Sequence, residues 1–559
     1  MKRLVLALAL FAGCAAPGGS AMTASAALAK LGDDYWEDVL RESPTYATYL
    51  GDFRYNDRLS DLSDAGRARW TSIARKHLAT LAAIDRAALP EVEKVSYDIL
   101  QLQLENSLEE QKHKFWQWNV DQMGGPQADF PQLMNFHPLT DEAGLIARFK
   151  AFPAYIGQYL DNLRAGVREG RVAMRKAVER VVGQLQEMLA TPVEKSPFAA
   201  KPSLVPAARD HVYPAFAAML AYLEKDYLPK ARTTDVGLWA LPGGAEAYRF
   251  KIRDHTTTDL SAEEIHRIGL AELKGIHAEM RAIAKTDDLR GYLEALKKDP
   301  KNFFASREDV LETARRDYET CLAALPKAFG RLPKNACEVK AIEDYREKDS
   351  VSAFYYPPDE KLTRKGIYYA NTFGAETRPR FNMRALTVHE AVPGHHLQIA
   401  LAMEIEGLPR FRRQAGFTAF IEGWGLYSER LADEMGLYED DLQRFGMLTY
   451  QAWRACRLVV DTGLHALKWT RQQAIDFFTE NIALSEREVL NEVDRYIIWP
   501  GQALAYMIGK REIFAVREEA RKTMGARFDL RAFHDVVLRN GALPLPTLRA
   551  LVGDWARGG

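Results

Sequence analysis

The sequence predicts a mainly α-helical protein, because helix-forming patterns fill most of the chain and strand-forming patterns are sparse. Helix-start patterns support the same fold class. Ser261 followed by Glu264 matches a capping box, in which each side chain bonds the backbone N–H of the other residue. Residues 306–309 and 485–488 open in a similar way. Stretches rich in the helix formers Ala, Leu, Glu, Arg and Lys span residues 62–85, 91–118, 142–168, 171–191, 205–230 and 261–286.

The composition is that of a globular protein that can bury a large core. Of the 559 residues, 47% are hydrophobic and 27% are charged, and the net charge of −1 gives no indication of a nucleic-acid partner. Proline-bearing breaks at 126–131, 192–206 and 357–358 separate helical blocks without marking a clear domain boundary. Residues 28–559 are therefore expected to form one unit, and nothing indicates an obligate protein partner.

The first residues are typical of an export signal. Two basic residues precede the apolar run 4–11, which is too short to span a membrane in a mature protein. Small residues before Cys14 resemble a bacterial lipobox, which predicts a signal peptide at 1–13, a lipid anchor on Cys14 and an Ala/Gly/Ser-rich tether at 14–27. Phe11 departs from that pattern, and a plain secretory signal is the alternative. The protein is thus expected in the cell envelope facing the periplasm, or secreted.

Export would place the cysteines in an oxidising compartment, where disulfides persist. Only Cys321, Cys337 and Cys456 follow Cys14, too few for a disulfide framework in so long a chain. One Cys321–Cys337 bridge and three buried free thiols are both consistent with the sequence.

The residues that carry chemistry gather at 389–396, which reads His-Glu-Ala-Val-Pro-Gly-His-His. Neutral imidazole suits Zn²⁺, and in zinc peptidases with His-Glu-x-x-His on a helix the glutamate is the general base. Here His395 and His396 follow His389 by six and seven residues instead of four. On an unbroken helix, seven residues separate two Cα atoms by about 10 Å along the axis. That is too far for two ligand bonds of about 2.0–2.1 Å to one ion.

Pro393 and Gly394 offer a way to shorten this distance. Proline cannot donate the helical hydrogen bond and glycine weakens a helix, so a bulge or kink is expected between the histidines. Two bulged residues would bring His395 to the place of the second histidine in the unbroken motif. His389 and His395 are then the predicted ligands. His396 is expected to make outer contacts or to reach the substrate, and it is the alternative ligand to His395.

A second helical stretch offers a third ligand. Residues 422–429 read Glu-Gly-Trp-Gly-Leu-Tyr-Ser-Glu, and Glu422 is the predicted third ligand of a two-His-one-Glu site with one position open for water. Gly423 and Gly425 would let two helices approach closely. Glu429 follows on the same helix face and is predicted to orient a histidine from outside the ligand set.

One segment, residues 366–372, has a clear strand pattern and lies shortly before the histidines. In zinc peptidases, an edge strand beside the active-site helix pairs with the substrate backbone. Tyr369 and Asn371 are therefore candidate substrate-binding residues. A short structural hairpin is the alternative.

Three strings resemble one known family. They are the ten residues at 389–398, the motif Glu-Gly-Trp-Gly-Leu-Tyr at 422–427, and Tyr-Ile-Ile-Trp-Pro-Gly-Gln-Ala at 496–503. Together they look like the bacterial lipoprotein family catalogued as domain of unknown function 885, and the similarity covers most of the mature chain. That family is placed among gluzincin-like metallopeptidases, distantly similar to the helical oligopeptidases and the angiotensin-converting-enzyme group. The resemblance implies a helical two-lobed fold around a deep central channel, with a small β element near the active site, one Zn²⁺ ion and peptide substrates.

Four further residues are assigned candidate roles. Asp461 and His465 are four apart and therefore neighbours on a helix face. His465 is a candidate oxyanion donor, and Asp461 is a candidate outer contact or alternative ligand. A structural Asp–His pair is the alternative for both. In helical peptidases a tyrosine from the far lobe donates to the oxyanion and a cation holds a C-terminal carboxylate. Tyr506 and Lys510 are the candidates for these two roles, and simple packing is the alternative for Tyr506.

These residues together predict zinc-dependent peptide hydrolysis in the cell envelope. Glu390 would take a proton from the attacking water and pass it to the leaving amine. Two alternatives stay open. The same site would also suit a metal-dependent hydrolase of non-peptide amides or esters, and a degenerate cleft would suit a non-catalytic lipoprotein that binds peptides.

Overall fold

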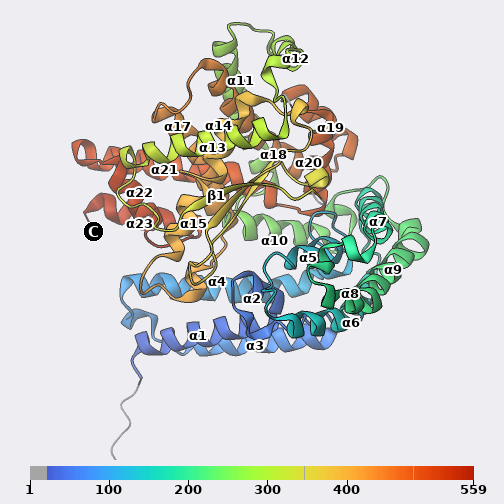
Figure 1. Ribbon diagram of the computed structural model, residues 1–559. Coiled ribbons are helices and arrows are strands. Elements are labelled where there is room, and N and C mark those ends of the chain that lie inside the picture. The colour runs from blue at the N-terminus through green and yellow to red at the C-terminus, as the bar shows by residue number, and fades with distance from the viewer. Residues whose placement is uncertain (1–21, 345–346, 483, 559) are drawn as a thin grey trace, which may run out of the picture.

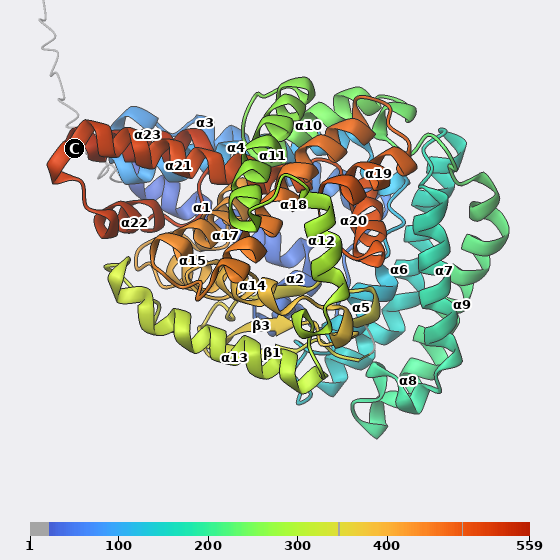
Figure 2. The ribbon, with the colours of Figure 1, turned by 90° about the horizontal axis from the view of Figure 1, so that it is seen from above.

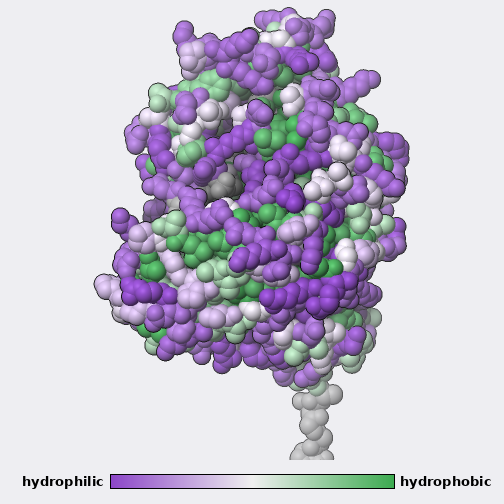
Figure 3. Space-filling view, turned by 90° about the vertical axis from the view of Figure 1, so that its right-hand side faces the viewer, coloured by the Kyte–Doolittle hydropathy of each residue, from purple (hydrophilic) through white to green (hydrophobic). Residues whose placement is uncertain are grey.

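The chain is mainly helical, as predicted (Figure 1). The computed structural model describes residues 22–344, 347–482 and 484–558, so Cys14 and the predicted signal peptide lie outside the described residues. Within these ranges, no helix is both long enough and apolar enough to cross a membrane. On the face drawn in Figure 3 the surface is mainly hydrophilic, with hydrophobic side chains in scattered patches.

Helices fill the first half of the chain. They are α1 (Ala24–Glu42), α2 (Pro44–Tyr49), α3 (Asp64–Ala82), α4 (Glu91–His113), α5 (Pro126–Leu133), α6 (Glu142–Arg168), α7 (Arg175–Ala190), α8 (Val205–Ala207), α9 (Tyr213–Tyr222), α10 (Gly244–Thr256), α11 (Ala262–Ala284), α12 (Leu289–Lys298) and α13 (Arg307–Ala324). Each of the six predicted helical stretches contains at least one of them. The stretch 205–230 includes two π-helical segments, Ala208–Val212 and Leu223–Tyr227.

Three short strands separate these helices from the second set. The strands are β1 (Cys337–Ala341), β2 (Ala353–Tyr356) and β3 (Gly366–Ala370). The later helices are α14 (Met383–Glu390), α15 (His395–Met403), α16 (Arg410–Arg413), α17 (Thr418–Glu434), α18 (Asp441–His465), α19 (Arg471–Asn481), α20 (Glu486–Ile498), α21 (Ala505–Met524), α22 (Leu530–Leu538) and α23 (Leu545–Arg557).

The helix-start patterns act as predicted in two of three cases. Full capping boxes form at Ser261 and at Ser485. At Ser306 only half of the box forms, because Asp309 accepts hydrogen bonds from the backbone of Ala305 and from Arg380 instead of reaching back to Ser306. The first helix starts at Ala24 and not at residue 28, because the Thr23 hydroxyl caps it by accepting from Ala26 N–H.

The described residues bury two large hydrophobic cores. One is built by residues 120–231, whose Phe130, Phe152 and Phe216 rings pack together, with centroids 4.0 Å and 4.9 Å apart in successive pairs. The other joins the N-terminal helices to the elements from 236 onward. Figure 2 shows α6–α9 as a separate layer at one side of the molecule. The segment 120–231 is thus inserted between two parts of the chain that share one core.

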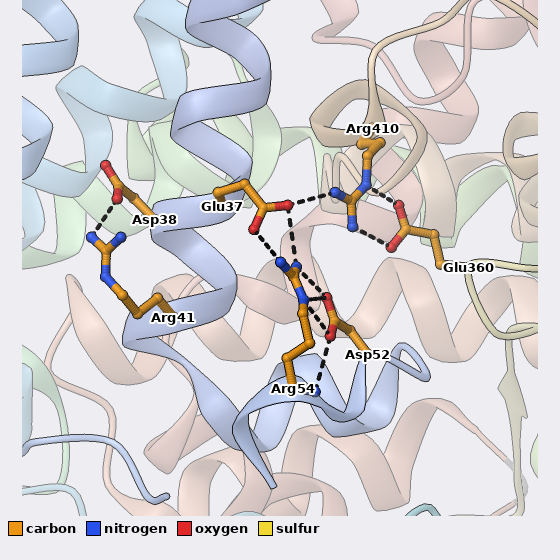
Figure 4. A network of polar contacts seen from close by, with 7 residues as sticks. All are labelled: Glu37, Asp38, Arg41, Asp52, Arg54, Glu360 and Arg410. Atoms are coloured by element: carbon orange, nitrogen blue, oxygen red, sulfur yellow. Dashed lines mark hydrogen bonds and ion pairs between the residues drawn. The ribbon is translucent and has the colours of Figure 1, made fainter.

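A charged network ties the first helix to the second half of the chain (Figure 4). Glu37 of α1 accepts a hydrogen bond from Arg410 Nη1 at 2.8 Å, and Arg410 also bonds both carboxylate oxygens of Glu360. Arg54 extends the network by joining Glu37 to Asp52. These contacts fix α1 against α16.

The strands form one sheet in the order β1-β3-β2, with β1 parallel and β2 antiparallel to β3. The predicted strand at 366–372 is β3, which ends at Ala370. It is the central strand and not an edge strand, because β1 and β2 occupy its two sides, and this corrects the prediction. β2 takes the edge position. The described cysteines Cys321, Cys337 and Cys456 are buried and free, so the Cys321–Cys337 bridge is not formed.

Candidate metal centre

The two halves of the histidine motif are joined by a bulge. α14 ends at Glu390 and α15 begins at His395. The Gly394 N–H donates to the carbonyl of Val388 at 2.9 Å, six residues earlier, where a regular helix bonds four residues earlier. The turn therefore holds two extra residues. Glycine is needed there, because a Cβ on Gly394 would lie 2.0 Å from the carbonyl oxygen of His389.

The bulge brings His389 and His395 together with Glu422 of α17. Nε2 of each histidine lies 3.4 Å from Oε2 of Glu422, and the three candidate ligand atoms lie within 4.8 Å of one another. Two ligand atoms at about 2.0–2.1 Å from one tetrahedral Zn²⁺ are about 3.3 Å apart. The two 3.4 Å separations match that value, so the donor types and their spacing fit a zinc ion.

Two glycines of α17 allow this approach, each against a different element. A Cβ on Gly425 would lie 2.8 Å from the His389 ring, so glycine there admits α14. A Cβ on Gly423 would lie 2.5 Å from the backbone of Gly509, so glycine there admits α21. α17 is thus held closely between the histidine helix and α21.

A buried chain of polar groups supports His389 from behind. Its Nδ1 lies 2.8 Å from Oε1 of Glu429. Gln451 donates to the other oxygen of Glu429 at 2.8 Å, and Lys510 donates to Gln451 at 2.9 Å. A carboxylate accepts a hydrogen bond from Nδ1–H, which leaves the lone pair of Nε2 directed towards the place where an ion would bind. Glu429 is therefore where an orienting residue is expected.

The charges of the triad are strongly coupled. Burial would lower the pKa of His389, but its hydrogen bonds to Glu422 and Glu429 outweigh burial and raise that pKa to about 9. Burial would raise the pKa of Glu422, but the charge of His395 and the hydrogen bonds from both histidines hold it well below its usual range. The site thus stabilises positive charge, as a cation site must.

His396 points elsewhere. Its Nδ1 lies 2.9 Å from the Tyr355 hydroxyl of β2, and burial lowers its pKa to about 4. It does not belong to the triad, whereas His395 does. Glu390, the residue after His389, is 8% exposed, and its carboxylate has no hydrogen-bond partner among the described residues. This carboxylate is available to a water molecule or a substrate.

A cavity of about 460 Å³ opens onto the triad, within the range of ligand sites. Glu390, Tyr506 and the whole of β2 line it. The Tyr506 ring stacks near the His389 ring, with centroids 6.2 Å apart and an interplanar angle of 20°. Arg495 and Gln502 donate to the Tyr506 hydroxyl at 3.2 Å and 3.4 Å. Both contacts use the oxygen, so the hydroxyl proton is left for a further acceptor.

Asp461 and His465 do not line this cavity. The His465 ring lies between the Leu238 N–H at 3.0 Å and the Tyr496 carbonyl at 2.9 Å, so both ring nitrogens bond backbone. Asp461 accepts from the Tyr248 hydroxyl and from the Gly501 N–H, and burial raises its pKa to about 7. Both side chains hold chain segments in place.

The three candidate substrate-binding residues also lie away from the triad cavity. Tyr369 stacks on Phe354 across the sheet at 5.0 Å. The Asn371 amide donates to the carbonyls of Glu347 and Val351 and borders a smaller neighbouring pocket. Lys510 is buried against Gln451, and burial lowers its pKa to about 8.

Sequence reasoning gave no role to the arginines of the cavity wall. Arg454 and Arg457 of α18 and Arg495 of α20 all line the cavity. The available signal was the presence of charged residues inside apolar helical runs. Arg454 and Arg457 are three apart and share a helix face with buried aromatic side chains.

The chain resembles known proteins in sequence and in fold. A proposed lipoprotein from Colwellia psychrerythraea has a crystal structure with a TM-score of 0.89, is 28% identical, and the match covers 96% of this chain and 100% of that chain. A proposed lipoprotein of unknown function from Shewanella oneidensis, 21% identical with a TM-score of 0.72 over 94% and 99% of the chains, shows the fold alone. The chain matches no curated protein. The bacterial family of unknown function DUF885 matches residues 44–552, and the chain belongs to this family.

Proposed function

We propose that this protein is a zinc-dependent hydrolase that cleaves peptides in the cell envelope. The triad of His389, His395 and Glu422 carries the proposal, because its 3.4 Å separations suit the ligand spacing of one Zn²⁺ ion. Glu390 adds a carboxylate that has no hydrogen-bond partner among the described residues. It lies next to the triad and lines the same cavity. Two histidines, one glutamate ligand and an adjacent glutamate base are the parts of a zinc hydrolase.

The residues of the site have separate roles in the proposed reaction. His389, His395 and Glu422 would hold Zn²⁺, which would supply a Lewis acid and lower the pKa of water at the site towards about 7. Glu390 accepts the proton of the attacking water and returns it to the leaving amine. Tyr506 donates a hydrogen bond from its hydroxyl group to the developing oxyanion. Glu429 fixes the ring of His389 through Nδ1.

Peptides are supported as substrates by the edge strand of the cavity. β2 lines the cavity along its length and lies at one edge of the sheet. An extended peptide can add to such an edge through backbone hydrogen bonds. Because β2 also carries Tyr355, the partner of His396, a peptide aligned there would lie beside the histidine helix.

Two observations support a location in the cell envelope. The small residues before Cys14 resemble a lipobox, and the two similar solved structures are proposed lipoproteins. A lipid on Cys14 would hold the enzyme at the membrane surface. Intact-mass measurement of the protein extracted from bacterial membranes would reveal the acyl chains.

The proposal is tested by Glu390→Gln. The variant should retain one zinc per chain and lose peptide hydrolysis by about 10²- to 10⁴-fold, the usual contribution of a general base. Metal content is measured by elemental analysis and hydrolysis by mass spectrometry of a digested peptide mixture. Glu406→Gln, an exposed glutamate just after α15, is the matched control and should behave as wild type. A Glu390→Gln protein as fast as wild type would contradict the proposed mechanism.

The same preparation separates the alternative functions. Cleavage of small esters and amides without cleavage of any peptide would indicate a metallohydrolase with non-peptide substrates. Purified protein without stoichiometric zinc, and without hydrolysis after zinc is added, would indicate a binding protein. The expected result is stoichiometric zinc and peptide cleavage that stops when a chelator is added and resumes with zinc.

A further inference from the structure

Three buried arginines meet in the wall of the triad cavity. Arg454 and Arg457 come from α18 and Arg495 from α20, and they are 4%, 2% and 7% exposed. The Tyr506 ring lies close to both the triad and this cluster. The Tyr506 centroid is 4.3 Å from Cζ of Arg457 and 6.2 Å from the centroid of the His389 ring. The cavity therefore has an arginine side and a metal side.

Among the residues that the structure describes, one carboxylate forms ion pairs with this cluster. Glu492 forms ion pairs with Arg457 at 2.9 Å and with Arg495 at 3.5 Å. Tyr496 donates to the same carboxylate and accepts from Nε of Arg457. The other two glutamates that line the cavity, Glu390 and Glu422, lie on the metal side beside the histidines.

Arg454 has no protein anion of its own. It forms no hydrogen bond or ion pair with any residue that the structure describes. Its guanidinium lies over the rings of Trp453 and Tyr450, with Cζ at 4.4 Å and 4.7 Å from their centroids. Its Nε and Nη1 are buried without a hydrogen-bond partner among the described residues, and so are Nη1 of Arg457 and Nε of Arg495.

The charge of the cluster is therefore unbalanced. For three guanidinium groups, the described residues supply one ion-paired carboxylate, and arginine keeps its proton at neutral pH. Ring contacts compensate in part, but buried donors without acceptors and buried charges without partners are costly. A group that supplies both negative charge and acceptor oxygens would satisfy the cluster. A carboxylate does so, because its two oxygens match the fork of a guanidinium.

We propose that Arg454, Arg457 and Arg495 bind a carboxylate of the substrate, so that the enzyme selects peptides with a free carboxylate near the cleaved bond. This names the substrate class within the proposed function and rests on it. An extended peptide advances about 3.3–3.6 Å per residue. The two distances through Tyr506 thus correspond to about three extended residues between the cleaved bond and the carboxylate. That carboxylate belongs to the C-terminus or to an acidic side chain.

The first experiment measures binding without turnover. Zinc-loaded Glu390→Gln protein is titrated by calorimetry with three probes of equal length. They are an N-acetylated alanine tetrapeptide with a free C-terminus, the same peptide as its C-terminal amide, and an amide whose last residue is glutamate. The free acid, the glutamate amide or both should bind about 10- to 100-fold more tightly than the alanine amide, the range of a hydrogen-bonded charge pair. Which of them does so identifies the source of the carboxylate.

The second experiment removes the unpaired arginine. Arg454→Gln breaks no hydrogen bond to the described residues, so the fold should persist, and it should reduce the preference for the acid to about threefold or less. Arg454→Lys keeps the charge without the fork and should retain part of the preference. Arg444→Gln is the matched control, because Arg444 lies on the same helix and pairs with Asp433 at the surface.

The results separate this inference from the proposed function. Equal binding of all three probes by the Glu390→Gln protein would overturn the carboxylate site, whether or not the wild type cleaves peptides. A preference for acids that Arg454→Gln leaves unchanged would overturn it as well. A preference that disappears in Arg454→Gln would support the site even if no probe is cleaved, in which case only the proposed hydrolysis fails.

Discussion

Two buried histidines on different helices, His389 of α14 and His465 of α18, differ in what surrounds them. They are 2% and 1% exposed. His389 contacts two carboxylates, Glu422 at 3.4 Å and Glu429 at 2.8 Å. His465 contacts two backbone groups, the N–H of Leu238 and the carbonyl of Tyr496. The two rings are equally buried, but the partners of His389 are charged and those of His465 are neutral.

The partners determine the charge that each ring can hold. Hydrogen bonds to carboxylates outweigh burial at His389 and raise its pKa to about 9. At His465 burial dominates and lowers the pKa to about 4. A backbone N–H on one nitrogen and a carbonyl on the other require the neutral ring and leave no lone pair for an ion. In this protein, carboxylate partners distinguish the candidate ligand His389 from the structural His465.

The largest effect is expected from Glu422→Gln, which removes the charged candidate ligand that lies beside His389. Zinc binding worth about 10–16 kcal/mol is shared among three or four ligands, so the affinity should fall by about 1000-fold. Competition with a chromogenic chelator measures it. His465→Gln should leave zinc affinity unchanged, because His465 lies outside the cavity. Equal losses in the two variants would show that the comparison is wrong.

A second prediction concerns the contribution of His465 to the pH dependence of folding stability. The unfolded chain takes up a proton on this histidine near its ordinary pKa of about 6.5, whereas the native ring does so only near 4. Between these values protonation favours the unfolded state, so this contribution to stability is complete above pH 6.5 and is lost as the pH falls towards 4. The full loss is about 3 kcal/mol.

Urea unfolding of wild type and His465→Gln, in steps from pH 7.5 to 4.5, isolates this contribution. Glutamine offers a donor and an acceptor but no titrating group. The stability difference between wild type and variant should therefore change across this pH range, in the direction that favours the variant at low pH. Parallel pH profiles would mean that the native His465 ring takes up its proton as readily as the unfolded one.

The sequence predicts the helices and the bulge between His389 and His395 well, because both depend on local patterns. Helix formers and capping residues act within a few positions. The count from His389 to His395, with a proline and a glycine between, is enough to predict a bulge. The structure adds its size, since Gly394 bonds six residues back instead of four.

The sequence does not predict features that depend on distant pairing. β3 reads as an isolated strand, and only the pairing of β1 with it turns it into a central strand. Lys510 follows Tyr506 by one helical turn, but Gln451 of another helix draws its ammonium away from the cavity. The arginine side requires α18 and α20 to meet, and no local pattern states which helices are neighbours.

The smallest of these effects is expected from Glu429→Gln, which tests whether a carboxylate outside the ligand set matters. The amide can still accept from Nδ1 of His389, so the ring keeps its orientation while it loses the adjacent negative charge. Loss of such an outer partner typically costs about 10- to 100-fold in metal affinity. Glu434→Gln is the matched control, because Glu434 lies on the same helix and pairs with Arg517. An affinity equal to that of wild type would mean that the ring orientation alone, without the charge of Glu429, prepares His389 for the ion.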